Sequence, residues 1–227
     1  MKMIDLSTEL RDGMPKPPSA PRVEMRYLLT PSVKEEERKG FTNKMEQFTI
    51  TTHVATHIDA PSHFSSNGKN IDDYPVEFFT MVPTIMLNIE REIYGEIGAA
   101  DIAEAEQKYG EIQNGDMVII NTGAYRRYEE PDYEKSPYLT EDGAQYLADK
   151  RVVMVAIDSF TVDDPRKKEK PAHVILLCKN EIPIIECVVN LGQISVNRFH
   201  TICMPLKIKE GSGAYTRMVA VLEEEYG

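Results

Sequence analysis

One short stretch of the 227-residue chain contains three of its five histidines. His53, His57 and His63 lie within eleven residues of one another, and Asp59 stands between the last two. Neutral imidazole nitrogens and carboxylate oxygens are ligands that zinc, manganese and iron accept in catalytic sites. Cysteine is absent from the stretch, which argues against a closed structural zinc site. Because three protein ligands would leave a coordination position for water, the stretch predicts a catalytic metal site.

The spacing of these residues restricts the local backbone. On a continuous helix, Asp59 would point roughly 240° away from His53. On a straight strand, the same two residues would lie about 20 Å apart, too far for one ion with bonds of about 2 Å. We therefore expect a strand that delivers His53, a tight bend near Ala55, and a second short extended piece with His57 and Asp59 on one side. The alternative is a strand whose histidines only happen to lie on its polar face.

The segment from His53 to Phe64 resembles a motif of the metal-dependent cyclase-like hydrolases, whose best-known members are bacterial kynurenine formamidases and isatin hydrolases. Their motif reads His-x-Gly-Thr-His-x-Asp-x-Pro-x-His-Phe, and this chain departs from it only at Ala55. If the bend requires a positive φ, alanine is strained there where glycine is not. Weaker similarities follow in the family's order along the chain, at Asp5–Ser7, Gly13–Pro15, Thr122-Gly123, Asp158-Ser159, His173, Leu176-Leu177, Glu186, Asn190-Leu191, Pro205-Leu206, Gly211–Gly213 and Arg217.

The residue patterns predict an α/β chain without a composition break, which we interpret as a single domain over residues 1–227. The resemblance implies a swivelling β/β/α-type fold, a mixed β-sheet barrel-like core with surrounding helices. Expected helices are Ala100–Tyr109, Glu141–Lys150 with Thr140 as N-cap, and Pro171 to about Cys178. Expected strands are Met3–Leu6, Arg22–Leu29, Glu46–Val54, Thr84–Ile89, Met117–Asn121, Val152–Ile157, Ile202–Lys209 and Thr216–Glu223, with a charged loop at Pro31–Thr42.

The family resemblance also implies a second metal site. In this interpretation His53, His57 and Asp59 hold one ion, Asp59 bridges with its other oxygen, and His173 with Glu186 completes a second site. From the residues alone, His173 could be a surface or capping residue, and Glu186 could be paired with a lysine or arginine. The cofactor expected is a divalent metal at two ions per chain, Zn²⁺ first, with Mn²⁺ and Fe²⁺ left open.

Two further residues are assigned roles. His63 is not needed in either ligand set and resembles the family's catalytic histidine, which would accept a proton from water and return it to the leaving amine. The alternative is that His63 only donates a hydrogen bond to a ligand carboxylate. Lys16, in the proline-rich loop after Gly13, is a candidate substrate-binding residue. His200 matches no motif and is expected to be a structural strand residue.

The bulk properties argue against several kinds of binding partner and location. A formal net charge of −11 disfavours binding to nucleic acid or to an anionic membrane surface. No apolar run approaches the roughly 20 residues that a membrane-spanning helix needs, and the first residues have no secretory pattern. We interpret Cys178, Cys187 and Cys203 as reduced thiols of a cytoplasmic protein. The resemblance implies a homodimer or larger homo-oligomer.

These observations predict a divalent-metal amidohydrolase that cleaves a non-peptide C–N bond with metal-activated water. The resemblance implies an arylformamidase, with N-formyl-L-kynurenine as substrate and kynurenine and formate as products, in tryptophan catabolism. The chain has no tryptophan, however, where the formamidases use one in the early proline-rich loop. Hydrolysis of a cyclic amide such as isatin, or of another small amide or ester, is therefore an alternative. A catalytically silent metal-binding protein is the alternative outside the enzymes.

Overall fold

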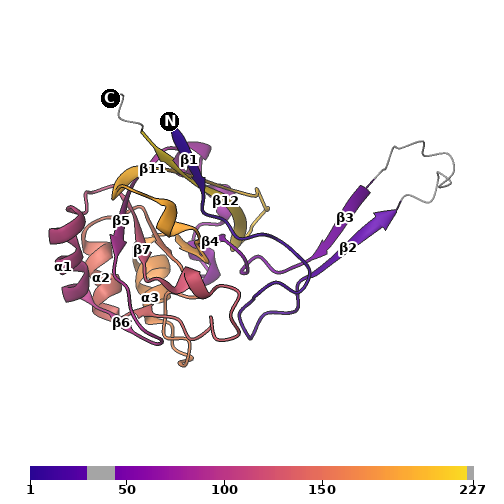
Figure 1. Ribbon diagram of the computed structural model, residues 1–227, viewed down its shortest axis with the longest axis horizontal. Coiled ribbons are helices and arrows are strands. Elements are labelled where there is room, and N and C mark those ends of the chain that lie inside the picture. The colour runs from indigo at the N-terminus through magenta and orange to yellow at the C-terminus, as the bar shows by residue number, and fades with distance from the viewer. Residues whose placement is uncertain (30–43, 224–227) are drawn as a thin grey trace.

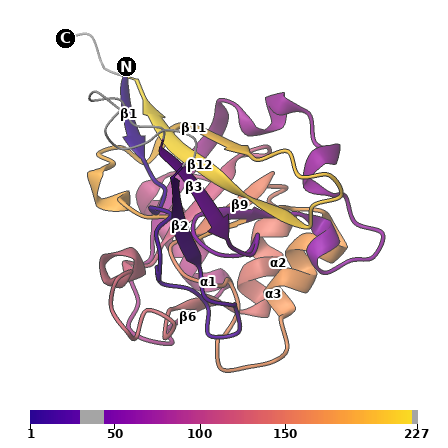
Figure 2. The same cartoon turned by 90° about the vertical axis from the view of Figure 1, so that its right-hand side faces the viewer.

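The computed structural model describes residues 1–29 and 44–223 and consists of a body of sheet and helices with one projecting arm (Figure 1). The arm is a two-stranded antiparallel ribbon of β2 (Glu24–Leu29) and β3 (Lys44–Thr49). In the view of Figure 2 it extends from the body towards the viewer. The charged loop expected at Pro31–Thr42 lies outside the described residues.

The body is built on an eight-stranded mixed sheet in the order β1-β12-β11-β5-β7-β9-β10-β4. The sheet closes because β4 pairs with β12 as well as with β10, while β1 pairs only with β12 on the outside. The other seven strands thus form a closed barrel, which confirms the expected barrel-like α/β core. The strands are β1 (Lys2–Asp5), β4 (His57–Asp59), β5 (Val82–Asn88), β7 (Met117–Asn121), β9 (Met154–Ile157), β10 (Ile184–Glu186), β11 (Arg198–Pro205) and β12 (Gly213–Leu222).

The helices begin and end close to the predicted residues. Helix α1 (Ala99–Tyr109) stops at Gly110, and α2 (Glu141–Asp149) starts at Thr140, whose hydroxyl accepts a hydrogen bond from the Gly143 amide. The last helix begins with Pro171 as α3 (Pro171–His173) and continues as π-helix through Val174–Lys179. Shorter elements are the pair β6 (Glu96–Ile97) and β8 (Tyr138–Leu139), and the 3₁₀ turns Pro61–His63, Ile71–Asp73, Val76–Phe79, Ala124–Arg127 and Leu191–Gln193.

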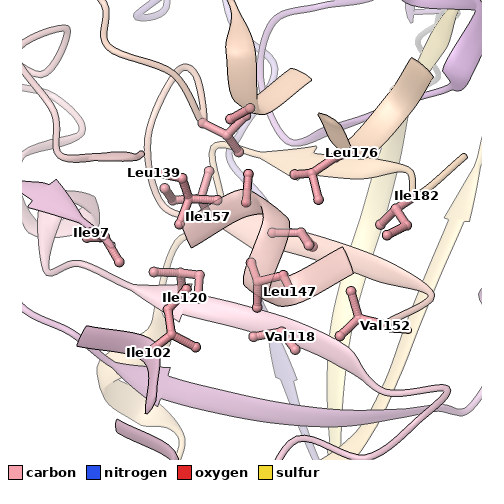
Figure 3. Packing of buried hydrophobic residues seen from close by; sticks show 14 of the residues in the cluster. Ile97, Ile102, Val118, Ile120, Leu139, Leu147, Val152, Ile157, Leu176 and Ile182 are labelled. Atoms are coloured by element: carbon pink, nitrogen blue, oxygen red, sulfur yellow. The ribbon is translucent and has the colours of Figure 1, made fainter. Parts of the chain in front are cut away.

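The central strands are buried on both faces, which explains their continuous apolar sequences. On β7, Val118 and Ile120 belong to the core between the sheet and the helices, whereas Met117 and Ile119 belong to the second core. Figure 3 shows the first of these cores, where Leu147 of α2 and other helix residues lie over the strands. The second core draws residues from strands all around the closed sheet, so it fills the barrel.

One predicted strand was wrong at the residue that matters for the site. The strand expected over Glu46–Val54 ends at Thr49. This residue pairs with Glu24, the first residue of β2, which is the one partner of β3 among the described strands. His53 therefore lies in a run of bends and not on a strand. His200, by contrast, lies on β11 as predicted.

The described residues bear on two features considered in the sequence, membrane-spanning helices and the state of the cysteines. Their helices are all too short or too polar to cross a membrane. Cys178, Cys187 and Cys203 are free thiols, and the last two are buried.

Candidate metal centre

The site is built on a three-residue strand of the barrel, β4, and on the bend before it. Ala55 adopts a φ of 58°, so the chain turns through the left-handed region at the position predicted for the bend. Thr56 fixes the exit from this bend, because its hydroxyl donates to the Cys187 carbonyl (2.7 Å) and accepts from the Thr8 amide (2.9 Å). His57 and Asp59 then follow two residues apart on β4, so their side chains point to one face of the sheet.

Pairing of β4 with both neighbours brings the remaining groups to this face. Glu186 of β10 lies directly opposite His57, and Gly213 of β12 lies opposite Asp59. His173 reaches the same place from α3. Because these elements come from widely separated parts of the chain, barrel closure assembles the cluster.

Two sets of possible ligands share one carboxylate. His53, His57 and Asp59 form the first set, and Asp59, His173 and Glu186 form the second, with the ligand atoms of each set within 4.8 Å of one another. Asp59 Oδ1 lies 2.6 Å from His53 Nδ1 and 3.1 Å from His57 Nε2, while its Oδ2 lies 3.5 Å from His173 Nε2. All five predicted ligands are thus brought together, and Asp59 faces both sets.

Each histidine has one nitrogen held by a partner outside the cluster. Nδ1 of His57 donates to the Ala55 carbonyl (2.9 Å), and Nδ1 of His173 lies 2.5 Å from the Asp163 carboxylate. For His53, Nε2 lies 3.0 Å from the Ser212 hydroxyl. The other nitrogen of each ring faces the carboxylates. Such partners orient metal-binding histidines and fix which nitrogen is free.

The Nε2 atom of His57 indicates whether a cation fits the cluster. It is buried and makes no hydrogen bond, although it lies near Asp59 and is 3.6 Å from Glu186. A buried polar nitrogen without a partner is costly, and a cation between it and the two carboxylates would satisfy all three groups. The residues present therefore fit a divalent metal.

The charges of the cluster lead to the same conclusion. Burial and the charge of Asp59 raise the pKa of Glu186 to about 7. Burial lowers the pKa of His57, but the charges of Asp59 and Glu186 outweigh it and raise this pKa to about 9. At His173, burial again lowers the pKa, but hydrogen bonds to Asp163 and Asp59 and the charges of Glu186 and Asp59 outweigh it and raise this pKa to about 10. The buried carboxylates favour protons on the neighbouring imidazoles. They therefore create a region of negative potential that a cation would occupy.

His63 lies beside the cluster but in neither ligand set. Its ring stacks on His53 with centroids 3.8 Å apart, and it is 6.2 Å from the ring of His173. Burial lowers the pKa of His63 to about 4, and the neighbouring imidazoles add to this effect against the charge of Asp59. The histidine is therefore neutral at pH 7. Phe64, the next residue, stacks on His173 at 4.6 Å.

The cluster opens into a cavity of about 420 Å³. Its walls include His63, Phe64 and Phe160, and prolines of the early loop. Lys16 does not line this cavity but an adjoining hollow, and its ammonium donates to the Pro17 carbonyl (3.3 Å). A larger cavity of about 650 Å³ lies behind the bend, against Ala55. The histidines and acids of the cluster do not line that cavity, so the smaller one contains the chemistry.

Three residues of the site were not found from the sequence. Asp163 accepts hydrogen bonds from the amides of Ala172 and His173 as well as from the His173 ring, and so fixes the start of α3. Ser212 holds His53, and Lys170 lines the cavity just before Pro171. No local pattern marks Asp163, ten residues before the ring it holds. Ser212, however, lies within the Gly211–Gly213 segment that the resemblance had singled out.

Comparison with known proteins agrees with this geometry. Residues 4–164, well over half of the chain, match the family model Cyclase, described as "Putative cyclase". The chain belongs to the cyclase family. It is 26% identical over 219 residues to a kynurenine formamidase of Bacillus anthracis, covering 96% of each chain. It is 28% identical over 185 residues to one from Bacillus thuringiensis subsp. konkukian, covering 81% of this chain and 82% of the other.

Solved structures of the family have the same architecture. Isatin hydrolase A from Labrenzia aggregata superposes with a TM-score of 0.84 at 25% identity, covering 98% of this chain and 94% of that chain. The aligned part includes nearly the whole chain, so the similarity in fold extends over the whole barrel.

Gly213 of β12 lies close to His53 of the first ligand set. A Cβ at this position would lie 2.7 Å from both His53 Cε1 and the Ile58 carbonyl oxygen. We expect Gly213→Ala to displace His53, lower metal affinity at least tenfold and lower the free energy of unfolding by about 1–3 kcal/mol. Metal titration and urea unfolding would measure these effects. Unchanged metal affinity would contradict the role of His53 as a ligand.

The raised pKa values of His57 and His173 predict proton release. Without a cation, both rings are protonated at pH 7, since their pKa values are about 9 and about 10. A metal ion needs the neutral ring, so binding should release about two protons from the rings and a further fraction from Glu186, whose pKa is about 7, and affinity should rise with pH up to about 10. Calorimetric titration in buffers of different ionisation enthalpy would count these protons. Binding without proton release would contradict the assignment of the two rings as ligands.

Proposed function

We propose that the protein is a metal-dependent hydrolase of the arylformamidase type, which cleaves N-formyl-L-kynurenine to kynurenine and formate in tryptophan catabolism. The observation that carries the proposal is the pair of ligand sets sharing Asp59 at the base of a cavity lined by the neutral His63. The formamidases of Bacillus to which the chain is similar support the choice of substrate.

The proposed ligands are His53, His57 and Asp59 for one ion, and Asp59, His173 and Glu186 for the other. Zn²⁺ is the first choice and Mn²⁺ or Fe²⁺ the alternatives, because all three accept nitrogen and oxygen ligands. Divalent ions held there would lower the pKa of water towards 7 and polarise the substrate carbonyl. The remaining roles belong to the protein's own side chains.

His63 is the proposed catalytic residue. Because its pKa lies near 4, the ring is neutral at pH 7 and a lone pair is free to take a proton from the attacking water. The same low pKa makes the protonated ring a strong acid. It would therefore return the proton readily to the leaving nitrogen, which is a poor leaving group without it. Stacking on His53 holds the His63 ring beside the reacting atoms.

The aryl group of the substrate would lie against the apolar part of the cavity. Phe64 and Phe160 contribute rings, and each is held in place, Phe64 by His173 and Phe160 by the edge-to-face contact with Tyr133 at 4.5 Å. Stacking on an aromatic ring is worth about 0.5–1.5 kcal/mol beyond burial. These two rings provide the aromatic surface that the chain lacks in its tryptophan-free early loop.

A second candidate is hydrolysis of a cyclic amide. The overall similarity to the isatin hydrolase of Labrenzia, at a TM-score of 0.84, supports it. The site groups proposed above would serve this reaction equally, since ring opening also requires attack on an amide carbonyl and protonation of its nitrogen.

A substrate panel on the metal-loaded protein tests these proposals. We expect hydrolysis of N-formyl-L-kynurenine and formanilide, with isatin slower by tenfold or more.

Asp59→Asn should lose both metal and activity, because one carboxylate serves both ions, whereas His63→Ala should keep its metal and lose at least a hundredfold in kcat. Full metal content in Asp59→Asn would contradict the bridging role. Metal present without turnover of any amide would favour a silent metal-binding protein.

We also propose that the protein is a homodimer or larger homo-oligomer. The support is the arm, which projects from the body and exposes Leu28 and Met45 on one face and Phe48 on the other, each by 38–49%. A lone two-stranded ribbon is marginally stable in water, and a group of exposed apolar side chains marks an interaction site. Light scattering should give a mass of at least two chains, and Phe48→Ser should shift it towards one. A wild-type mass of one chain at micromolar concentration would contradict the proposal.

A further inference from the structure

The walls of the metal cavity carry few charges away from the metal cluster. Pro17, Pro18, Phe64 and Phe160 make much of its surface apolar. Among the described residues that line it, Lys170 is the only lysine or arginine, and three have carboxylates, namely Asp59, Glu186 and Glu134. In a chain of net charge −11, such a cavity would repel anions unless a cation compensates locally.

Lys170 is held close to the reacting atoms by the chain itself. It lies three residues before His173, so the two Cα atoms are at most roughly 11 Å apart. Asp163 fixes this segment by accepting from the amides of Ala172 (2.7 Å) and His173 (3.2 Å). The lysine is half-buried at the start of α3, and its position is therefore coupled to that of a proposed metal ligand.

The ammonium group of Lys170 has no acidic partner among the described residues. It donates to the backbone carbonyl of Asp164 at 3.3 Å. The carboxylate of that aspartate is already paired with Arg166 at 2.8 Å and faces Lys167 at 3.7 Å. With one neutral acceptor for three N–H donors, the ammonium retains hydrogen-bonding capacity for a ligand in the cavity.

We propose that Lys170 binds a carboxylate of the substrate and makes the enzyme prefer aryl amides that carry an acid group over neutral ones. The inference rests on the proposed function, because it states where the carboxylate end of the substrate lies relative to the amide that is hydrolysed. With the amide at the metal cluster and the ring between Phe64 and Phe160, the carboxylate meets the positive side chain of the wall. Lys16, the candidate substrate-binding residue from the sequence, lines the adjoining hollow instead.

The test compares an acidic and a neutral substrate on matched variants. Lys170→Met removes the cavity charge, and Lys167→Met removes a charge from the same loop but outside the cavity. We expect Lys170→Met to raise KM for 2-formamidobenzoate by about tenfold, as for loss of a charged hydrogen bond, and to change KM for formanilide less than twofold. Lys167→Met should change neither. Equal effects of Lys170→Met on both substrates would overturn the proposal.

A binding experiment separates this proposal from the proposed function. Calorimetry on the metal-loaded proteins would compare 2-aminobenzoate with aniline, which need no turnover. If no formamide is hydrolysed, the proposed function fails, and binding of 2-aminobenzoate that is lost in Lys170→Met would still support the role of Lys170. Equal affinity of wild type and Lys170→Met for 2-aminobenzoate would overturn it. Selective loss in Lys16→Met with Lys170→Met unaffected would return the role to Lys16.

Discussion

The structure depends on the pairing of one three-residue strand with two neighbours. β4 forms ladders with β10 on one side and β12 on the other, and this closes the barrel. The same strand carries His57, which belongs to the first ligand set, and Asp59, which belongs to both. A change that weakens the closure would thus also separate the ligands. Burial of charged groups, which is unfavourable alone, is possible here because the closed ladders and the core beneath them hold those groups in place.

Much of the fold was predictable because local signals and tertiary structure agree. Thr140 is an N-cap in sequence and in space, Gly110 ends its helix, and Met117–Asn121 is a strand with the predicted limits. The histidine spacing required a bend near Ala55, and the φ of 58° there shows that the chain takes a left-handed turn even without glycine. In these cases a backbone requirement or an apolar run leaves few alternatives, so the sequence is enough.

The rest of the site depends on contacts that have no local signal. Asp163 and Ser212 hold histidines that lie ten and 159 residues away. Their spacing in the chain carries no period. Closure of the barrel brings Ser212 to His53, and the loop between β9 and α3 brings Asp163 to His173. The strand expected through Val54 failed for a related reason. β-branched residues favour extended backbone, but beyond Thr49 none of the described strands pairs with the chain. Pairing partners decide where a strand ends.

Three histidines with the same intrinsic chemistry differ in protonation because their partners differ. His173 contacts the carboxylate of Asp163, and His57 faces two buried acids, so their pKa values rise to about 10 and about 9. His63 is buried without a carboxylate of its own, and its pKa falls to about 4. A cation near the cluster would displace protons from the first two rings and would further disfavour protonation of the third. Metal binding at the first two rings and a neutral His63 ring at pH 7 are therefore compatible.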